Sequence, residues 1–218
     1  MSRHGRSLRR KPAGKSASRR VLVCFEGDVT ERLYVNGLRK ILRRHPVYIE
    51  QGSANGEPLK LVRGAIARMK EVRSGDAYDD VWCLFDVETP PHGSLDAALS
   101  LAAKNNINCA VSNPCFELWL LLHVTSCNRY MTTSDMIECA TRELPSYSGK
   151  SFAFEDFEGF IEVASIRSME LEKRYGAHEK VQRKNPSTSV WKFIRVLEEH
   201  GGFDFASRSS SSPGPTMG

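Results

Sequence analysis

The sequence lacks the segments that would mark it as a membrane or secreted protein. It contains no apolar run near 18 residues, the length that a membrane-spanning helix requires. Its amino terminus has no charged segment followed by an apolar stretch and a cleavage site, which is the pattern of a secretory signal. We therefore expect a soluble, cytoplasmic protein with no membrane partner.

Cysteine pairs at metal or redox spacing are also missing. The six cysteines include no CxxC pair and no zinc-finger spacing, and Cys24, Cys83 and Cys109 fall inside predicted strands. Free cysteine in a strand behaves as a small buried hydrophobe, so free thiols in a reducing compartment are favoured over disulfides or zinc. The sequence has no GxxxxGK[ST] loop, so the chain itself is not expected to hydrolyse ATP.

Acidic residues are absent from the first 20 positions, which hold eight Lys and Arg. These eight charges exceed the net charge of +5, so residues 21–218 carry a net charge of −3. The Gly, Ser and Pro content of this segment predicts a disordered basic arm. Such an arm suits nonspecific contact with a nucleic-acid backbone through counterion release, and a solubilising tail without a role is the alternative.

Strand-like and helical patterns alternate over residues 21–125. Apolar runs predict strands at 21–25, 47–50, 81–85 and 107–111, and helical spacing predicts helices at 30–44, 58–72, 93–104 and 115–124. Runs that are apolar on both alternations suit strands buried on both faces. The pattern predicts an α/β fold, with an open parallel sheet of about four strands and helices on both faces.

Only helices are predicted beyond residue 125, at 132–144, 155–175 and 185–200. The last of these begins at the NPST sequence of residues 185–188, and glycine ends it at 201. The expected organisation is a basic arm over 1–20, an α/β core over 21–125, a helical extension packed on the core over 126–203, and a disordered tail over 204–218.

Acidic side chains follow three of the predicted strands. Glu26 follows the first, Asp86 and Glu88 follow the third, and Glu117 comes shortly after the fourth. Ligands bind beyond the carboxyl ends of parallel strands, and oxygen ligands without His or Cys favour Mg²⁺ or Mn²⁺. Carboxylates that share a small volume need a cation between them. The alternative is a strand order that separates them as unrelated solvated acids.

Glu117 lies among apolar residues and is expected to be buried. Asn113 is predicted to cap this helix and Pro114 to be its first residue, while Thr30 is predicted to cap the helix after the first strand. A buried carboxylate without a partner costs several kcal/mol. Glu117 is therefore either paired with an arginine or a backbone N–H, or it serves the same site as the other acids.

Four motifs together resemble the RloB family over residues 20–200. They are EGxxTExxY at 26–34, FDxE at 85–88, SNPCFELW at 112–119 and NPST at 185–188. Members of this family resemble Toprim-fold nucleases, including those of the OLD type, and occur beside restriction and phage-defence genes. The resemblance implies a Toprim-like parallel sheet and a Mg²⁺ or Mn²⁺ site built from an early Glu and a later Asp-x-Asp.

Carried onto this chain, the resemblance implies that Glu26 is the catalytic acid or base and that Asp86 and Glu88 are metal ligands. Glu31 is implied as an assisting acid, by analogy with the OLD-type Glu pair, and Glu117 is a further candidate ligand. The chain departs from the pattern at Glu88, where the second acid is usually Asp. The expected reaction is metal-assisted hydrolysis of DNA or RNA, tRNA included, in anti-phage defence.

The substrate-binding candidates are Asn113 and the basic cluster Lys180, Arg183 and Lys184, whose alternative role is a solvated approach to the last helix. His92 is a candidate substrate contact because it follows the loop that holds Asp86. If the family's role applies, an AAA-type ATPase is expected as a separate partner chain.

Two other function classes stay open. One is a haloacid-dehalogenase-type phosphatase, whose nucleophile loop would need Asp and then Gly at positions 88 and 89. The other is a non-catalytic nucleic-acid-binding or sensor protein.

Overall fold

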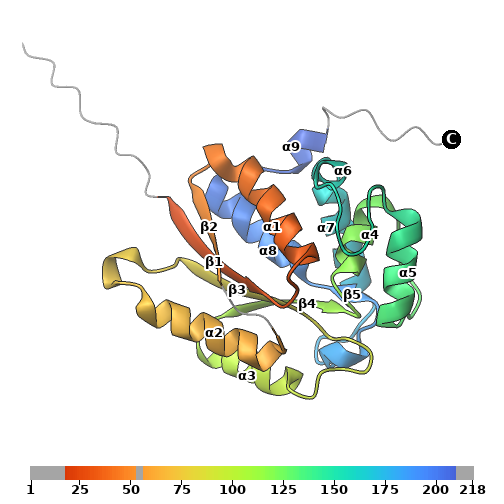
Figure 1. The fold of residues 1–218 in the computed structure, drawn as a ribbon, viewed down its shortest axis with the longest axis horizontal. Helices are drawn as coiled ribbons and strands as arrows, with labels where there is room; N and C mark the ends of the chain where they lie inside the picture. Colours follow the sequence, from red (N-terminus) through yellow and green to blue (C-terminus); the bar gives the residue numbers. More distant parts are fainter. Residues whose placement is uncertain (1–17, 53–55, 210–218) are drawn as a thin grey trace, which may run out of the picture.

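Five strands form one sheet at the centre of the computed structural model, which describes residues 18–52 and 56–209 (Figure 1). They are β1 (Arg19–Phe25), β2 (Val47–Gln51), β3 (Asp80–Asp86), β4 (Asn108–Asn113) and β5 (Ser187–Thr188). The order is β2-β1-β3-β4-β5, with β5 antiparallel to β4 and the other neighbours parallel. This confirms the predicted α/β class and the open sheet with four parallel strands, to which the structure adds the antiparallel β5.

Helices cover both faces of the sheet (Figure 1). One face packs against α1 (Thr30–Ile41), α4 (Glu117–Val124), α7 (Ile161–Glu172) and α8 (Val190–Gly201), and the other against α2 (Pro58–Glu71) and α3 (Leu95–Lys104). The remaining elements are η1 (Leu42–Arg44), η2 (Ser74–Asp76), α5 (Thr133–Glu143), α6 (Glu155–Glu158), η3 (Val181–Arg183) and α9 (Ala206–Ser209). α7 and α8 thus share the apolar cluster that includes β1.

The alternation of β1 explains its burial on both faces. Val21, Val23 and Phe25 lie in the cluster with α1 and α8, while Leu22 and Cys24 lie in the cluster with α2 and α3. Successive side chains of a strand point to opposite faces, so a run without polar residues needs cover on both.

The order of the strands places the topological switch point of the sheet between β1 and β3. The chain runs from β1 to β2 on one side and then returns past β1 to β3 on the other. Ligands of open α/β sheets bind at this kind of switch point, beyond the strand ends. The first residues after β1 and β3 therefore lie where a binding site is expected.

The carboxy-terminal part differs from the prediction in two places. Residues 187–188 form β5 instead of opening the last helix, which begins at Val190. A two-residue strand has no periodicity that a sequence could reveal. The helix predicted over 155–175 is interrupted, because α6 ends at Glu158 and α7 begins at Ile161.

The two predicted tails are shorter than expected where the structure describes them. Arg19 and Arg20 belong to β1, and the rest of the predicted arm, residues 1–17, lies outside the described residues. Phe205 is buried and its N–H donates to Glu198, and residues 206–209 form α9, so the tail prediction is wrong from 204 to 209. Residues 210–218 lie outside the described part. No helix in the described ranges is long and apolar enough to cross a membrane.

Candidate active site

The ends of β1 and β3 bring Glu26 and Asp86 together. The N–H of Glu26 continues the ladder by donating to the Leu84 carbonyl at 3.1 Å. The Glu26 Oε2 atom accepts a hydrogen bond from the Asp86 N–H at 3.3 Å. Because β1 and β3 are neighbours in the sheet, acids 60 positions apart meet at one edge.

A turn after β3 carries Glu88 toward the end of β4. The N–H of Val87 donates to the Ser112 carbonyl at 2.8 Å, and the N–H of Glu88 donates to the Pro114 carbonyl at 2.9 Å. Glu88 has a left-handed backbone with φ of 67°. This conformation costs a residue with a side chain about 1–3 kcal/mol and is concentrated at functional sites. The turn replaces the extended exit in which Asp86 and Glu88 would point to opposite faces.

Glu31 folds back from the start of α1 against Gly27. Its carboxylate is buried, and Oε1 accepts a hydrogen bond from the Gly27 N–H at 3.2 Å. A Cβ at position 27 would lie 2.2 Å from Glu31 Oε2. Glycine is therefore required at 27 so that the carboxylate can approach the backbone.

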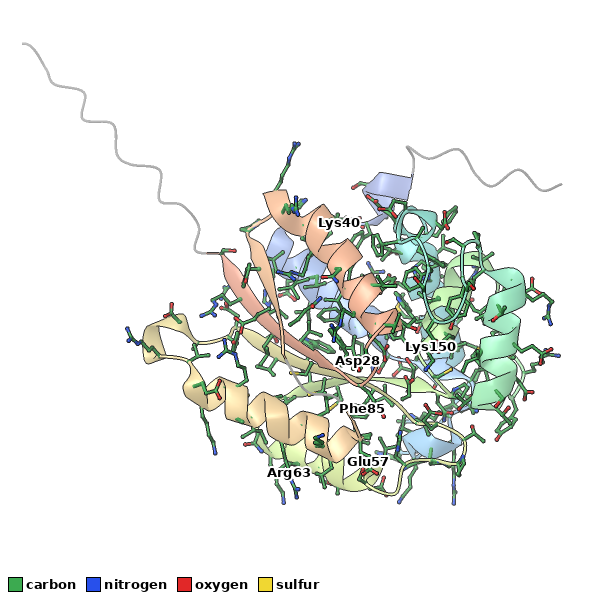
Figure 2. The ribbon with its side chains drawn as sticks, viewed as in Figure 1. Asp28, Lys40, Glu57, Arg63, Phe85 and Lys150 are labelled. Atoms are coloured by element: carbon green, nitrogen blue, oxygen red, sulfur yellow. The ribbon has the colours of Figure 1, made fainter. Side chains whose placement is uncertain are left out.

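Thr30 was predicted to cap α1, and this prediction is wrong. Thr30 is the first residue of the helix, and Val29 precedes it as the cap. Its hydroxyl lies within hydrogen-bonding distance of Glu117 Oε1, at 3.3 Å, and of the Lys150 carbonyl, at 3.1 Å. Figure 2 labels Asp28 and Lys150, which come from the loop after β1 and from the extension, near the same end of α1.

Glu117 is buried and its partners are neutral. The Tyr147 hydroxyl donates to Glu117 Oε1 at 2.8 Å, in addition to the contact with Thr30. One alternative for Glu117 was a pair with an arginine, and no such ion pair is found among the described residues. Asn113 is not the cap of α4, because the cap is Phe116 and the Asn113 side-chain amide donates to the Val181 carbonyl at 2.8 Å. The Asn113 side chain is thus held by η3 rather than by the start of α4.

Electrostatic repulsion couples these acids, which we call the acidic rim: Glu26, Glu31, Asp86, Glu88 and Glu117. Burial raises the pKa of Asp86 well above its ordinary value, and the other four acids raise it further. Burial raises the pKa of Glu31 to about 7, with further contributions from Glu117 and Glu26. Burial also raises the pKa of Glu26, with Glu88 adding to it and the Asp86 N–H and His92 opposing it.

The acidic rim fits a small hard cation held by few protein ligands. Within 18–52 and 56–209, no Lys or Arg forms an ion pair with Glu31, Asp86, Glu88 or Glu117. No three rim acids bring ligand oxygens within 4.8 Å of one another in that part of the chain. Mg²⁺ retains several waters and is usually bound through one or two carboxylates. The rim could therefore contribute one or two carboxylates to Mg²⁺ or Mn²⁺, with waters as the remaining ligands.

The acids that do approach within 4.8 Å of one another lie elsewhere, at Glu162, Glu198 and Asp204. Arg195 already pairs with two of them, donating to Glu162 and Glu198 at 2.8 Å each. Arg195 therefore compensates part of the charge of this cluster, whereas no Lys or Arg of the described residues does so for the acidic rim.

His92 lies against the rim rather than in open solvent. Its Nε2 atom is 3.0 Å from Glu26 Oε1. Sequence position suggested only proximity to the Asp86 loop, and the structure places the imidazole against the carboxylate of Glu26. Tyr147 was not predicted, because it follows Glu117 by 30 positions in a loop with no motif.

The predicted basic cluster is attached to α3. Lys180 Nζ lies 2.9 Å from Asp96 Oδ2, and the Asn113 amide holds Val181 of η3. Arg183 is exposed and, in the described residues, neither Arg183 nor Lys184 forms an ion pair. Asn113 thus links η3 to the end of β4, and substrate binding by these residues stays a prediction.

A family profile described as RloB-like protein matches residues 21–197. The chain therefore belongs to the RloB-like family. No curated protein and no solved structure matches the chain.

Proposed function

We propose that this RloB-like protein is a metal-dependent nuclease that hydrolyses phosphodiester bonds in nucleic acid. The observation that carries the proposal is the acidic rim, in which five carboxylates meet at the switch point of the sheet. Among the described residues none of the five pairs with a Lys or Arg, and only Glu26 has a basic neighbour, His92. Carboxylates without a compensating charge at such a position destabilise the folded protein unless a cation binds between them. Phosphodiester hydrolysis is a reaction that such cations promote.

Asp86 and Glu88 would hold the ion, with Glu31 and Glu117 completing the negative surroundings. When bound, Mg²⁺ or Mn²⁺ polarises the scissile phosphate and stabilises the leaving oxygen. Tyr147 orients Glu117 by donating to its Oε1 atom, and the Gly27 N–H orients Glu31. Neutral donors keep these carboxylates in place without cancelling their charge.

Glu26 would transfer the proton. Its two oxygens have different neighbours, the Asp86 N–H at Oε2 and His92 at Oε1. The hydrogen bond from the Asp86 N–H would orient the carboxylate at this end of the sheet. A carboxyl with a raised pKa holds and releases a proton nearer to neutral pH, as general acid–base catalysis requires.

The biological setting that we propose rests on the family. RloB-like membership supports a role in anti-phage defence in the cytoplasm, with DNA or RNA, tRNA included, as substrate and a separate AAA-type ATPase as partner.

A non-catalytic nucleic-acid-binding or sensor role is the second candidate. It is favoured by one observation, that no three rim acids in the described ranges have ligand oxygens within 4.8 Å of one another. Under this alternative a divalent ion would neither stabilise the protein nor support cleavage.

Purified protein is incubated with plasmid, single-stranded DNA and total RNA, with Mg²⁺ or Mn²⁺ or with EDTA. We expect cleavage of at least one substrate with metal only. Glu26→Gln should lower the rate by about 10²–10⁴-fold, the usual contribution of a positioned acid or base. Asp86→Asn should lower it at least as much.

The matched control is Asp28→Asn, because Asp28 lies two positions from Glu26 but is exposed and paired with Arg32 at 3.0 Å. It should cleave like the wild type. Cleavage that persists equally in Glu26→Gln and Asp86→Asn would rule out this nuclease site.

A further inference from the structure

A groove of about 760 Å³ lies beside the second half of α1 and is not part of the acidic rim. Its walls are α1, η1, the edge strand β2 and residues 152–155. The residues used below are Ser18, Arg39, Lys40, Arg43, Tyr48 and Glu155. The walls of the groove are closely packed. The ring of Phe154 lies so near Gly37 that a Cβ at position 37 would be 2.0 Å from it.

Positive charge dominates this groove. Arg39, Lys40 and Arg43 are exposed. One acid lines the groove, Glu155, and its Oε1 atom lies 3.7 Å from Lys40 Nζ. In the part of the chain that the structure describes, Arg39 and Arg43 have no acidic partner. Guanidinium groups are well suited to phosphate because their planar donors bind two oxygens at once.

The groove adjoins other features that suit nucleic acid. Tyr48, on its β2 wall, is 49% exposed, and an exposed aromatic ring beside cations is a feature of surfaces that bind single strands. Ser18 also lines the groove, and the sequence before it contains six Lys and Arg and no acid. The most basic segment of the sequence therefore joins the described chain at this surface.

α1 connects the groove with the rim. It begins at Thr30 and Glu31, beside the acids, and its last turn carries Arg39 and Lys40. Twelve residues at 1.5 Å each span about 18 Å, or about five steps of a nucleic acid with a 3.4 Å rise. Figure 2 shows Asp28 and Lys40 near opposite ends of α1. One nucleic acid could therefore occupy both.

We infer that this basic groove binds the phosphodiester backbone of a nucleic acid whose neighbouring segment reaches the acidic rim. Binding of the phosphodiester backbone by Arg39 and Arg43 does not depend on the proposed function. The delivery of the bound strand to the acidic rim does rest on the proposed function.

The test is fluorescence anisotropy of the full chain with labelled single-stranded DNA, single-stranded RNA and duplex DNA in EDTA, so that no strand is cut. The variant is Arg39→Glu/Arg43→Glu. Its matched control is Arg63→Glu/Lys70→Glu, which makes the same charge change at exposed residues of α2 on the other face of the sheet. Figure 2 labels Lys40 and Arg63 on opposite sides of the molecule.

We expect the groove variant to bind at least about tenfold more weakly than the control. The slope of log K against log salt should become shallower by about 1.4 for single strands or about 1.8 for the duplex, the loss of two phosphate contacts. The more strongly affected probe identifies the form of nucleic acid. Equal binding by the groove variant and the control would overturn the inference, as would displacement of the probe by a polyglutamate peptide at equal charge concentration.

Cleavage assays separate this inference from the proposed function. If the wild type cuts nothing but the groove variant loses binding, the groove stands and the nuclease proposal fails. If the wild type cuts and the groove variant binds and cuts like its control, the groove inference fails and the nuclease proposal stands.

Discussion

Glu26 Oε2 accepts a hydrogen bond from the backbone N–H of Asp86, so the acids that end β1 and β3 are joined directly. The carboxylate of Asp86 itself has no such compensation, since burial and four neighbouring acids all raise its pKa. The charged form of Asp86 is thus unfavourable in the protein alone. A bound divalent cation would make the charged form of Asp86 favourable. Metal binding at the rim should therefore change the free energy of unfolding.

Asp86→Asn should stabilise the protein without metal and abolish its response to metal. Asn is neutral at every pH, so the variant avoids the cost of either charging the carboxyl beside Glu31 and Glu117 or keeping it protonated. In the wild type, Mg²⁺ or Mn²⁺ at 100 times its Kd should add about 2.7 kcal/mol to the free energy of unfolding. Thermal unfolding with EDTA and with each ion measures both effects. An unchanged metal response in Asp86→Asn would contradict the assignment.

Glu31 should make the metal-free protein less stable as the pH rises. Its pKa is about 4.5 when unfolded and about 7 when folded. Between these values the folded state binds more protons, so the free energy of unfolding falls as the pH rises through 7. The difference of about 2.5 pKa units corresponds to about 3 kcal/mol.

Urea unfolding at several pH values in EDTA measures this loss, and Glu31→Gln should remove it. Comparison with that variant is needed because His123 acts with the opposite sign. Burial lowers the pKa of His123 to about 3, so its contribution to stability is lost as the pH falls below about 6.5. Equal pH profiles for Glu31→Gln and the wild type would show that Glu31 is ionised in the folded protein.

Tyr147→Phe should destabilise the protein by about 1–3 kcal/mol, because it leaves the buried Glu117 with one fewer donor. Burial and Glu117 raise the pKa of Tyr147, so its hydroxyl stays protonated and donates. Urea unfolding measures the loss. Tyr130→Phe is the control, since Tyr130 is 66% exposed and should change stability by less than about 0.5 kcal/mol. A loss no larger than that of the control would mean that the hydrogen bond to Glu117 contributes nothing.

Gly27→Ala should reduce activity while the fold is retained. The added Cβ would meet Glu31 Oε2 at 2.2 Å and displace the carboxylate. A displacement of about 1 Å in an active site can cost about 10²-fold in rate. Nuclease rate and circular dichroism measure the two effects. Gly93→Ala is the matched control, because a Cβ there meets nothing within 4 Å, and the two variants should differ in rate only.

Local patterns were sufficient for the framework of the sheet. The apolar run at 21–25 predicted β1, and the helix predicted from residue 58 is α2, which begins at Pro58. The helix predicted from residue 132 is α5, which Thr132 caps by forming a capping box with Asp135. Each of these features depends on residues that are close in sequence, so a local pattern is enough to predict it.

Several features of the site depend on contacts between distant segments. Glu88 adopts a left-handed turn because its N–H reaches Pro114, and Glu117 is satisfied by Tyr147 rather than by arginine. Asn113 has the residue type of a helix cap but holds η3 instead. No local rule distinguishes these outcomes, because each competing partner is supplied by another part of the fold.

The sequence by itself determined the four parallel strands and the helices between them, and that an acid follows the first and third predicted strands. Only the tertiary structure decided that β1 lies between β2 and β3, so that Glu26 and Asp86 are neighbours. The physical reason is that burial of apolar faces specifies each strand separately, whereas the order of the strands follows from how all the helices pack on the sheet. The acidic rim is a product of that order.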